Sequence, residues 1–198
     1  MKLLIFAGSS RAQSFNRQLA KIAANLARQA GAEVTLLELS SLDIPMYNAD
    51  LEALCTPPDV IRLKEILFAH PGWIICSPEY NGSYTALLKN TLDWASSPVK
   101  GDTNWQQGIK AFTGKVVGLL SASPGALGGL RSLAHLTPML LNLQCWVTPQ
   151  QFALGQAGSA FDADGQLTND KQLAGIDAVV KQVLWAAERL TPTSATVN

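Results

Sequence analysis

Residues able to bind a ligand or to do chemistry are concentrated in three short loops, each directly after an apolar run. The first loop, "GSSRAQSFN", offers hydroxyls at Ser9 and Ser14, a guanidinium at Arg11 and an amide at Asn16, just where a helix is predicted to begin. The free N–H groups and partial positive charge of a helix N-terminus bind anions, and Arg11 adds a forked cationic donor. The loop therefore favours a phosphate site, although a simple helix cap at Ser14 beside a solvated Arg11 has the same local pattern.

The second loop, "SPEYNGS", indicates a rigid turn. Pro78 fixes its own φ, and the Asn-Gly pair that starts at Asn81 readily takes left-handed conformations. A flat heterocycle would find backbone donors and acceptors on such a loop, with Tyr80 as an aromatic surface beside them. Glu79 is the one candidate for a catalytic carboxylate, but we interpret the loop as a shelf that holds a ring. A plain strand-to-helix turn with Ser83 as the N-cap is the alternative.

The third loop, "SASPGALGG", contains three glycines, which allow the backbone to approach a ligand closely; a flexible linker is the alternative.

The sequence has no pattern typical of a metal site or of a serine nucleophile. The two histidines, His70 and His135, fall in predicted helices away from the loops and lack metal-ligand spacing, and there is no GxSxG elbow. We therefore assign no catalytic side chain and no metal site, and expect a cofactor to supply any difficult chemistry.

Five apolar runs alternate with five stretches of helical spacing. The predicted strands are 3–7, 34–39, 73–76, 116–120 and 145–147, and the predicted helices are 15–29, 60–69, 84–95, 130–143 and 173–190. Strands that are apolar throughout are typical of a parallel sheet covered on both faces. The pattern favours a flavodoxin-like α/β three-layer sandwich with strand order 2-1-3-4-5, in which the loops after strands 1, 3 and 4 converge.

Composition points to one globular domain over 1–198 that handles small molecules. The chain has 198 residues, 47% of them apolar, and equal numbers of basic and acidic residues without a run of either sign. This balance argues against a nucleic-acid partner or a membrane-surface anchor. The opening "MKLLIFAGSS" is too short for a signal peptide or a membrane span, and the three cysteines lack CxxC spacing, so a cytoplasmic location is expected.

Two of these segments resemble a known family. "GSSRAQSFNRQLA" resembles the GSxRxxSxNxxLA phosphate loop, and "SPEYNGSYTALLKNTLDW" resembles the PEYNGSxxxxLKNxxDW signature, of the NADPH-dependent FMN reductase family. This family includes flavin-containing quinone, chromate and azo-dye reductases with a flavodoxin-like fold. Ser10 departs from the family pattern, which often has a larger apolar residue there.

The resemblance implies that all three loops bind FMN. The residues that would bind its phosphate are Ser9, Arg11, Ser14, Phe15 and Asn16. Those that would line the isoalloxazine are Pro78, Glu79, Tyr80 and Asn81. Those that would close the third side are Ser121, Ser123 and Gly125.

The resemblance also implies a ping-pong mechanism, in which NAD(P)H passes a hydride to FMN and a small acceptor then takes two electrons at the same face. Family members are typically dimers or tetramers, so a homo-oligomer is expected. Three alternatives stay open: a flavin reductase that uses FMN as a substrate, a flavodoxin-like electron carrier without NAD(P)H activity, and a flavin-binding regulator. The neutral charge of the chain argues against the carrier, because flavodoxins tend to be acidic. The acceptor and the preferred nicotinamide are not predicted.

Overall fold

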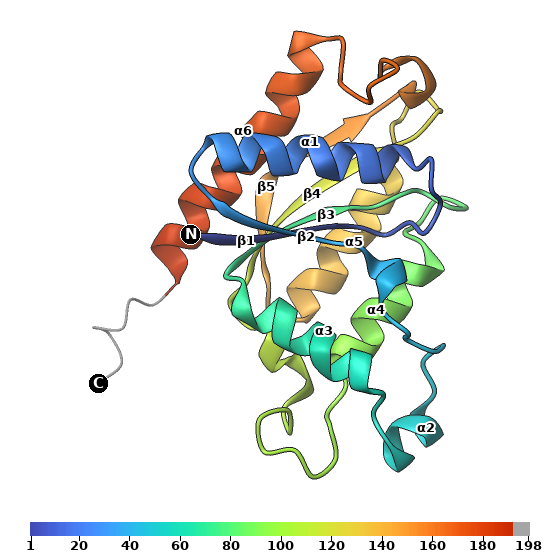
Figure 1. Cartoon of the computed structure of the whole chain (residues 1–198), viewed down its shortest axis with the longest axis vertical. Helices are drawn as coiled ribbons and strands as arrows, with labels where there is room; N and C mark the ends of the chain where they lie inside the picture. Colours follow the sequence, from blue (N-terminus) through green and yellow to red (C-terminus); the bar gives the residue numbers. More distant parts are fainter. Residues whose placement is uncertain (192–198) are drawn as a thin grey trace.

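The chain folds around a five-stranded parallel sheet, seen in the computed structural model, which describes residues 1–191 (Figure 1). The strand order is β2-β1-β3-β4-β5, and every neighbouring pair is parallel. The strands are β1 (Lys2–Ala7), β2 (Glu33–Leu37), β3 (Gly72–Cys76), β4 (Val116–Ala122) and β5 (Trp146–Leu154). The flavodoxin-like order predicted from the sequence is therefore confirmed.

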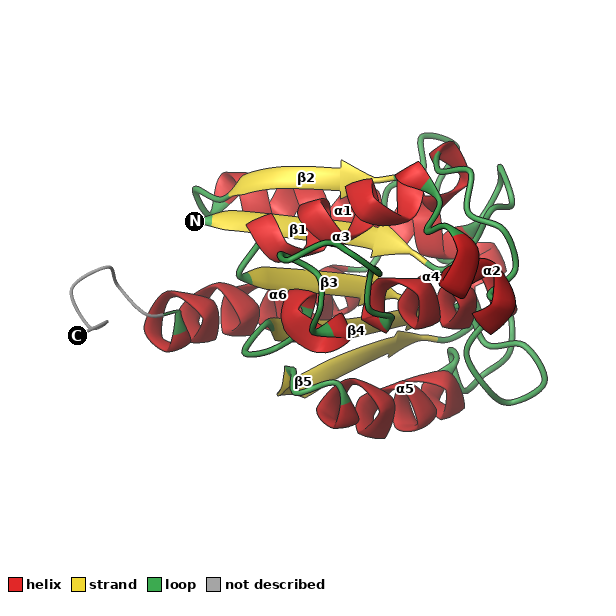
Figure 2. Ribbon diagram, turned by 90° about the horizontal axis from the view of Figure 1, so that it is seen from below, coloured by secondary structure: helices red, strands yellow, loops and turns green. Residues whose placement is uncertain are grey.

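Helices cover both faces of the sheet (Figures 1 and 2). One face is covered by α1 (Phe15–Gln29) and α6 (Asp170–Leu190). The other is covered by α3 (Pro58–Ala69), α4 (Ala86–Ser96) and α5 (Leu130–Asn142). The short helix α2 (Ala49–Leu54) and three 3-10 turns, at Leu39–Ser41, Gly108–Ala111 and Ala157–Ser159, lie in the connections. Among residues 1–191, no helix combines the length and the apolar character needed to span a membrane.

The two faces have separate hydrophobic cores, which explains why the strands are apolar throughout. In β1, Leu3 and Ile5 pack toward α1 and α6, while Leu4 and Phe6 pack toward the opposite helices. Gly118 in β4 permits the close approach of α6, because a Cβ atom there would lie only 2.5 Å from a methyl group of Val183. Such burial on both sides is what a doubly covered parallel sheet requires.

Three predicted strand ends differ from the structure. The strand predicted at 116–120 continues to Ala122, and the one predicted at 145–147 continues through Pro149 and two glutamines, since β5 ends at Leu154. An edge strand tolerates a proline, and the pairing of β4 with β5 shifts register between Val117 and Leu119. The strand predicted at 34–39 ends at Leu37, where the chain turns into the 3-10 helix.

Two helix predictions also need correction. No helix was predicted between 40 and 57, but this connection contains α2, whose N-cap Asn48 accepts hydrogen bonds from the N–H groups of Asp50 and Leu51. Helix α4 begins at Ala86, and its N-cap is Thr85, not Ser83. Thr85 also donates its hydroxyl hydrogen to the carbonyl of Gly8 at 2.7 Å, so α4 is tied to the first loop.

Candidate functional site

The loops after β1, β3 and β4 meet at the carboxyl end of the sheet and enclose a cleft of about 280 Å³. In Figure 2 the strands point toward this side, where the loops gather. Nine of the twelve residues predicted to bind the cofactor line the cleft; the lining residues are Ser9, Arg11, Ser14, Phe15, Asn16, Pro78, Glu79, Tyr80, Ala122, Ser123 and Pro124. The convergence of the three loops, which the strand order predicted, is thus observed.

At the first loop the N-terminus of α1 presents free donors to the cleft. Ser14 is the N-cap, and its Oγ accepts a hydrogen bond from the N–H of Arg17 at 3.4 Å. The N–H groups of Phe15 and Asn16 have no acceptor among the described residues, as is usual for the first turn of a helix. Arg11 forms no ion pair with any carboxylate of residues 1–191. This end of the cleft can therefore bind an external anion.

The side chain of Asn16 has a structural role instead. Its Nδ2 donates to the carbonyl of Ala122 at 2.8 Å, and its Oδ1 accepts from the N–H of the same residue at 3.0 Å. Both polar atoms of the amide are consumed in joining α1 to the end of β4. Asn16 can thus serve a ligand only through its backbone N–H.

The second loop forms a small hairpin. Tyr80 and Ser83 exchange two backbone hydrogen bonds of 2.9 and 3.0 Å, and between them Asn81 and Gly82 have φ values of 52° and 79°. Two positive φ values in an Asn-Gly pair are the signature of a type I′ turn, so the predicted rigid turn is confirmed. Asn81 lies at its exposed tip and does not line the cleft, whereas Tyr80 lines it and is 57% exposed.

Glu79 is held at the N-terminus of α5 by a residue that the sequence analysis missed, Arg131. One carboxylate oxygen accepts from Nε of Arg131 at 2.7 Å and also from its Nη2, and the other accepts from the Arg131 backbone N–H at 3.1 Å. The Glu79 side chain is only 8% exposed, against 62% for Arg131. Hydrogen bonds from the guanidinium hold the pKa of Glu79 below its ordinary value, outweighing its partial burial.

One signal for Arg131 was present in the sequence. A cation in the first turn of a helix opposes the helix dipole, so the position of Arg131 two residues after Gly129, where a helix is predicted to begin, indicates a nearby anion. His135, one turn further along α5, was expected to lie away from the loops, and this was wrong: its Nδ1 lies 3.1 Å from Oγ of Ser83. His70 does lie apart from them, beside Thr35.

The third loop is only partly open to the cleft. Ser121 is fully buried, and its Oγ donates to the carbonyl of Ser77 at 2.6 Å, so it supports the second loop from behind. Ser123 lines the cleft, while Gly125 lines an adjoining hollow of about 260 Å³. This second hollow shares Glu79 and Ser123 with the first and also contains Arg131. The two hollows therefore adjoin each other at Glu79 and Ser123, and together we call them the cleft.

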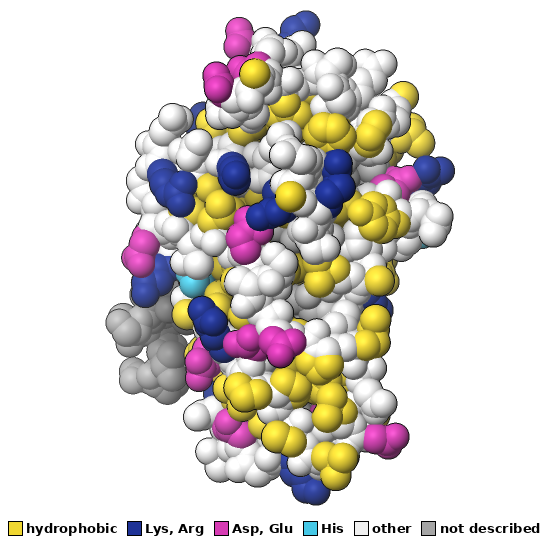
Figure 3. Space-filling model, turned by 45° about the vertical axis from the view of Figure 1, so that its right-hand side comes forward, with side chains coloured by type: hydrophobic (Ala, Val, Ile, Leu, Met, Phe, Trp, Pro, Cys, Tyr) yellow, Lys and Arg dark blue, Asp and Glu magenta, His cyan; other side chains and the backbone are white. Residues whose placement is uncertain are grey.

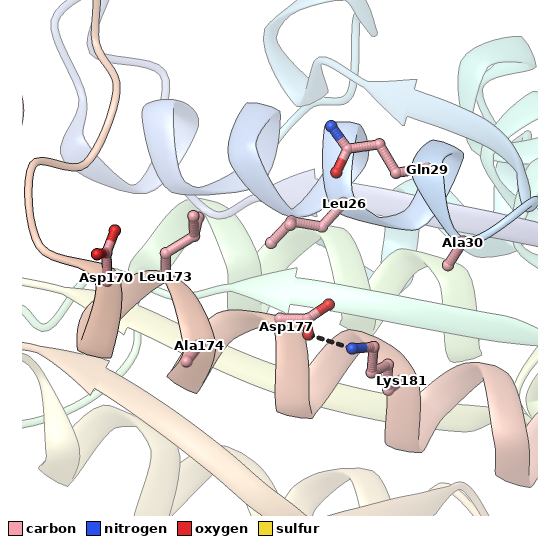
Figure 4. Close-up of a pocket in the computed structure, with 8 residues that line it drawn as sticks. All are labelled: Leu26, Gln29, Ala30, Asp170, Leu173, Ala174, Asp177 and Lys181. Carbon is pink, nitrogen blue, oxygen red and sulfur yellow. Dashed lines mark ion pairs between the residues drawn. The ribbon is translucent and has the colours of Figure 1, made fainter.

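A larger hollow lies elsewhere, in a groove between α1 and α6 (Figure 4). Its volume is about 440 Å³, but it is far from the three loops in the fold and shares no lining residue with them. Of its three charged residues, Asp177 and Lys181 pair with each other at 2.6 Å, and the third, Asp170, is an acid that cannot donate to an anion. We therefore place the candidate site at the smaller cleft, where donors are unpaired.

The described residues contain no cluster of His, Cys, Asp and Glu that could hold a metal ion. Cys76 and Cys145 are buried, and burial raises the pKa of the Cys145 thiol to about 12, so it is a poor nucleophile. Figure 3 brings the loop side forward and shows basic side chains across its upper half and hydrophobic ones gathered near the bottom.

Comparison with known proteins agrees with the motifs. Residues 1–159 match the family described as NADPH-dependent FMN reductase. The chain is 35% identical to an NAD(P)H-dependent FMN reductase of Pseudomonas aeruginosa, over 86% of each chain. It is 32% identical to a quinone reductase of Pseudomonas putida, over 89% of each.

A solved structure of a flavoenzyme has a similar fold. The flavoenzyme NAD(P)H:(acceptor) oxidoreductase of Paracoccus denitrificans superposes with a TM-score of 0.80 at 29% identity, covering 96% of this chain and 98% of that one. The flavin cofactor and the enzyme class indicated by the loop motifs are thereby confirmed. The chain belongs to the NADPH-dependent FMN reductase family.

Proposed function

We propose that the protein is an FMN-dependent NAD(P)H oxidoreductase that passes two electrons to a small acceptor by a ping-pong mechanism. The observation that carries this proposal is a single cleft with an unpaired anion site at one end, the N-terminus of α1, and an exposed aromatic shelf at Tyr80 beside it. The relatives named as FMN and quinone reductases support it.

The donor set fits a flavin phosphate. Ser9 and Ser14 offer hydroxyls, Arg11 offers a charged fork, and the N–H groups of Phe15 and Asn16 are free. The ring would lie along Pro78, Glu79 and Tyr80, while Asn81 shapes the hairpin behind them. Ser123 and Gly125 would close the third side, supported by Ser121 from beneath.

FMN, when bound, supplies the redox chemistry by accepting a hydride from NAD(P)H and releasing two electrons to an acceptor. The chain's own residues bind and orient; none is proposed as a catalytic acid, base or nucleophile. Since the described residues form one cleft at the loops, the nicotinamide and the acceptor would use it in turn, as a ping-pong mechanism requires.

An anaerobic titration tests the proposal. The purified protein should be yellow, or turn yellow when FMN is added, and NADH or NADPH should bleach it before any acceptor is present. A panel of quinones, azo compounds, chromate and free flavin should then restore the colour at different rates. A colourless protein that binds no added FMN would overturn the proposal.

Two further outcomes distinguish related functions. If flavin leaves the protein during steady turnover, the protein is a flavin reductase that treats FMN as a substrate. If FMN binds but neither nicotinamide reduces it, the protein is a flavodoxin-like carrier or a flavin-binding regulator.

We also propose a cytoplasmic homo-oligomer, a dimer or a tetramer, without nucleic-acid or membrane partners. Exposed apolar side chains beside α2 support an association surface: Met46 is 72% exposed and Leu54 84%. Light scattering coupled to size-exclusion chromatography measures the mass directly, and a mass of one 21.2 kDa chain would contradict this part of the proposal.

A further inference from the structure

At the α5 end of the cleft, the carboxylate of Glu79 already occupies the anion-binding donors. Among the described residues that line the two joined hollows, the charged ones are Arg11, Arg131 and Glu79. Arg11 has no carboxylate partner within residues 1–191, whereas Arg131 is bonded to Glu79. The cleft thus has one free cation and one neutralised cation.

Glu79 occupies the position that an external anion would take. It accepts from Nε and Nη2 of Arg131 and from a first-turn N–H of α5, which are the same kinds of donor that α1 leaves free at the other end. The carboxylate is largely buried, so the solvent screens its charge weakly. A second anion entering this end would therefore find Arg131 and the α5 N–H already bonded to Glu79 and would gain no unpaired donor there.

We infer that Glu79 is a specificity-determining residue, an internal anion that keeps negatively charged acceptors out of the α5 end of the cleft and favours neutral ones. This inference rests on the proposed function, in which the FMN phosphate takes Arg11. With Arg11 occupied, no unpaired cation remains among the described lining residues for a sulfonate, a carboxylate or an oxyanion. An anionic acceptor would lose its hydration without gaining a free cation, and an unpaired charge of this kind discriminates between partners.

The test uses two acceptors that differ by one charge, 1,2-naphthoquinone and its 4-sulfonate. The measured quantity is the ratio of kcat/KM for the neutral quinone to kcat/KM for the sulfonate, which cancels any general loss of activity. Glu79→Gln makes the pair net positive, and the ratio should fall about tenfold at low ionic strength. Arg131→Gln makes it net negative, and the ratio should rise about threefold or more.

The double variant Glu79→Gln/Arg131→Gln restores a neutral pair, so its ratio should return close to that of the parent. All the differences should shrink as salt is added. If Glu79→Gln does not fold, Arg131→Gln carries the test alone, and a ratio that does not rise would overturn the inference.

Asp177→Asn is the matched control. Asp177 lies on α6 in the groove of Figure 4, where it pairs with Lys181, so the variant makes the same change of carboxylate to amide beside a cation, away from the cleft. Its ratio should equal that of the parent. A shift as large as that of Glu79→Gln would show that the net charge of the molecule sets selectivity, and would overturn the inference.

A second readout needs no flavin. In apoprotein carrying Arg11→Gln, which removes the cation at the α1 end, millimolar sulfate is compared with chloride at equal ionic strength. It should raise the thermal midpoint only slightly, through the free N–H groups of α1 and through exclusion of sulfate from the protein surface. The further change Glu79→Gln should make the rise clearly larger, because Arg131 and the α5 N-terminus become free. An equal rise in both proteins would overturn the internal-anion role even if the oxidoreductase activity is demonstrated. Loss of flavin binding with this sulfate response intact would instead contradict the proposed function.

Discussion

Helices α1 and α5 begin at the same edge of the sheet and have an arginine near their first turn, yet only one of them is open to a ligand. At α1, Arg11 lies over the ring of Phe15 and forms no ion pair, and two backbone N–H groups have no acceptor among the described residues. At α5, Arg131 and its N–H hold the Glu79 carboxylate. The N-terminus of a helix with a nearby arginine can thus bind a cofactor or hold a loop in place. Which of the two it does depends on whether the chain itself supplies the anion.

The closed end depends on two turns that bring Glu79 and α5 together. The type I′ turn at Asn81 folds the second loop into a compact hairpin, and Gly129 lets α5 start against it. A Cβ atom on Gly129 would lie 3.6 Å from Cβ of Glu79 and only 1.9 Å from Oγ of Ser121.

Gly129→Ala should disrupt the closed end most severely. Gly129 has a φ of +90°, and the added methyl group would overlap the fully buried Ser121. Left-handed strain and overpacking together should lower the free energy of unfolding by about 2 to 4 kcal/mol, measured by urea denaturation. The control Gly158→Ala adds its methyl group to open space and should stay within about 0.5 kcal/mol of the parent. Equal stability of the two variants would contradict the close packing at Gly129.

Arg11→Gln should weaken the open end without disturbing the closed one. A charge-assisted hydrogen bond contributes about 1.5 to 3 kcal/mol, so the Kd for FMN should rise about 10- to 100-fold in a fluorescence titration. Riboflavin, which lacks the phosphate, should bind the variant as well as the parent. Arg28→Gln, at the other end of α1, is the matched control and should leave both Kd values unchanged. An equal loss of riboflavin affinity in Arg11→Gln would place Arg11 elsewhere than at the phosphate.

Glu79→Gln should have a smaller effect than Arg11→Gln. It should change the Kd for FMN more than the rate at which NAD(P)H reduces bound FMN. Loss of the carboxylate loosens the shelf by about the worth of one hydrogen bond, about 1 kcal/mol, so the Kd for FMN should rise about fivefold. With flavin saturating, the rate of bleaching by NAD(P)H in a stopped-flow experiment should change by less than about threefold. A large drop in that rate at full occupancy would show that Glu79 takes part in the reaction.

The sequence was sufficient to predict most of the fold and the open end of the cleft, because both depend on local patterns. Apolar runs located the strands, and helical spacing gave the bounds of α1 without error. Ser14 was a recognisable cap, and Asn-Gly a recognisable turn. Strand β5 was cut short because a proline within an edge strand interrupts the apolar run.

The closed end could not be predicted, because it depends on contacts between distant residues. Glu79 and Arg131 are 52 positions apart, and no local pattern joins them. The roles of the residues in the helical half of the family signature could not be predicted either. Asn90 and Trp94 both donate to the carbonyl of Pro45, at 2.9 and 2.8 Å. These two side chains anchor the connection before α2 and lie outside the cleft lining, which only the fold reveals.

Ser14→Ala should weaken the start of α1 slightly. Loss of an N-cap costs about 0.5 to 2 kcal/mol, and the long 3.4 Å bond to Arg17 places Ser14 at the lower end of that range. The free energy of unfolding should therefore fall by about 0.5 kcal/mol, while Ser14→Asp, which keeps a cap acceptor, should stay close to the parent. Because a new carboxylate would repel the phosphate, Ser14→Asp should nonetheless bind FMN more weakly than Ser14→Ala. The reverse order of FMN affinity would contradict an anion site at this helix end.

The smallest expected effect is that of pH on the closed end. The pKa of Glu79 is lowered from its ordinary value of 4.5. The stability that its ionised carboxylate adds to the folded loop is therefore complete above pH 4.5 and is lost as the pH falls through the lower pKa of the folded state. The ratio of the riboflavin Kd of Glu79→Gln to that of the parent should therefore stay constant from about pH 8 to about pH 5.5. The use of riboflavin removes the titration of the FMN phosphate from the measurement. A ratio that falls toward one between about pH 7 and about pH 6 would show that Glu79 titrates there, and that Arg131 does not hold it as a permanent anion.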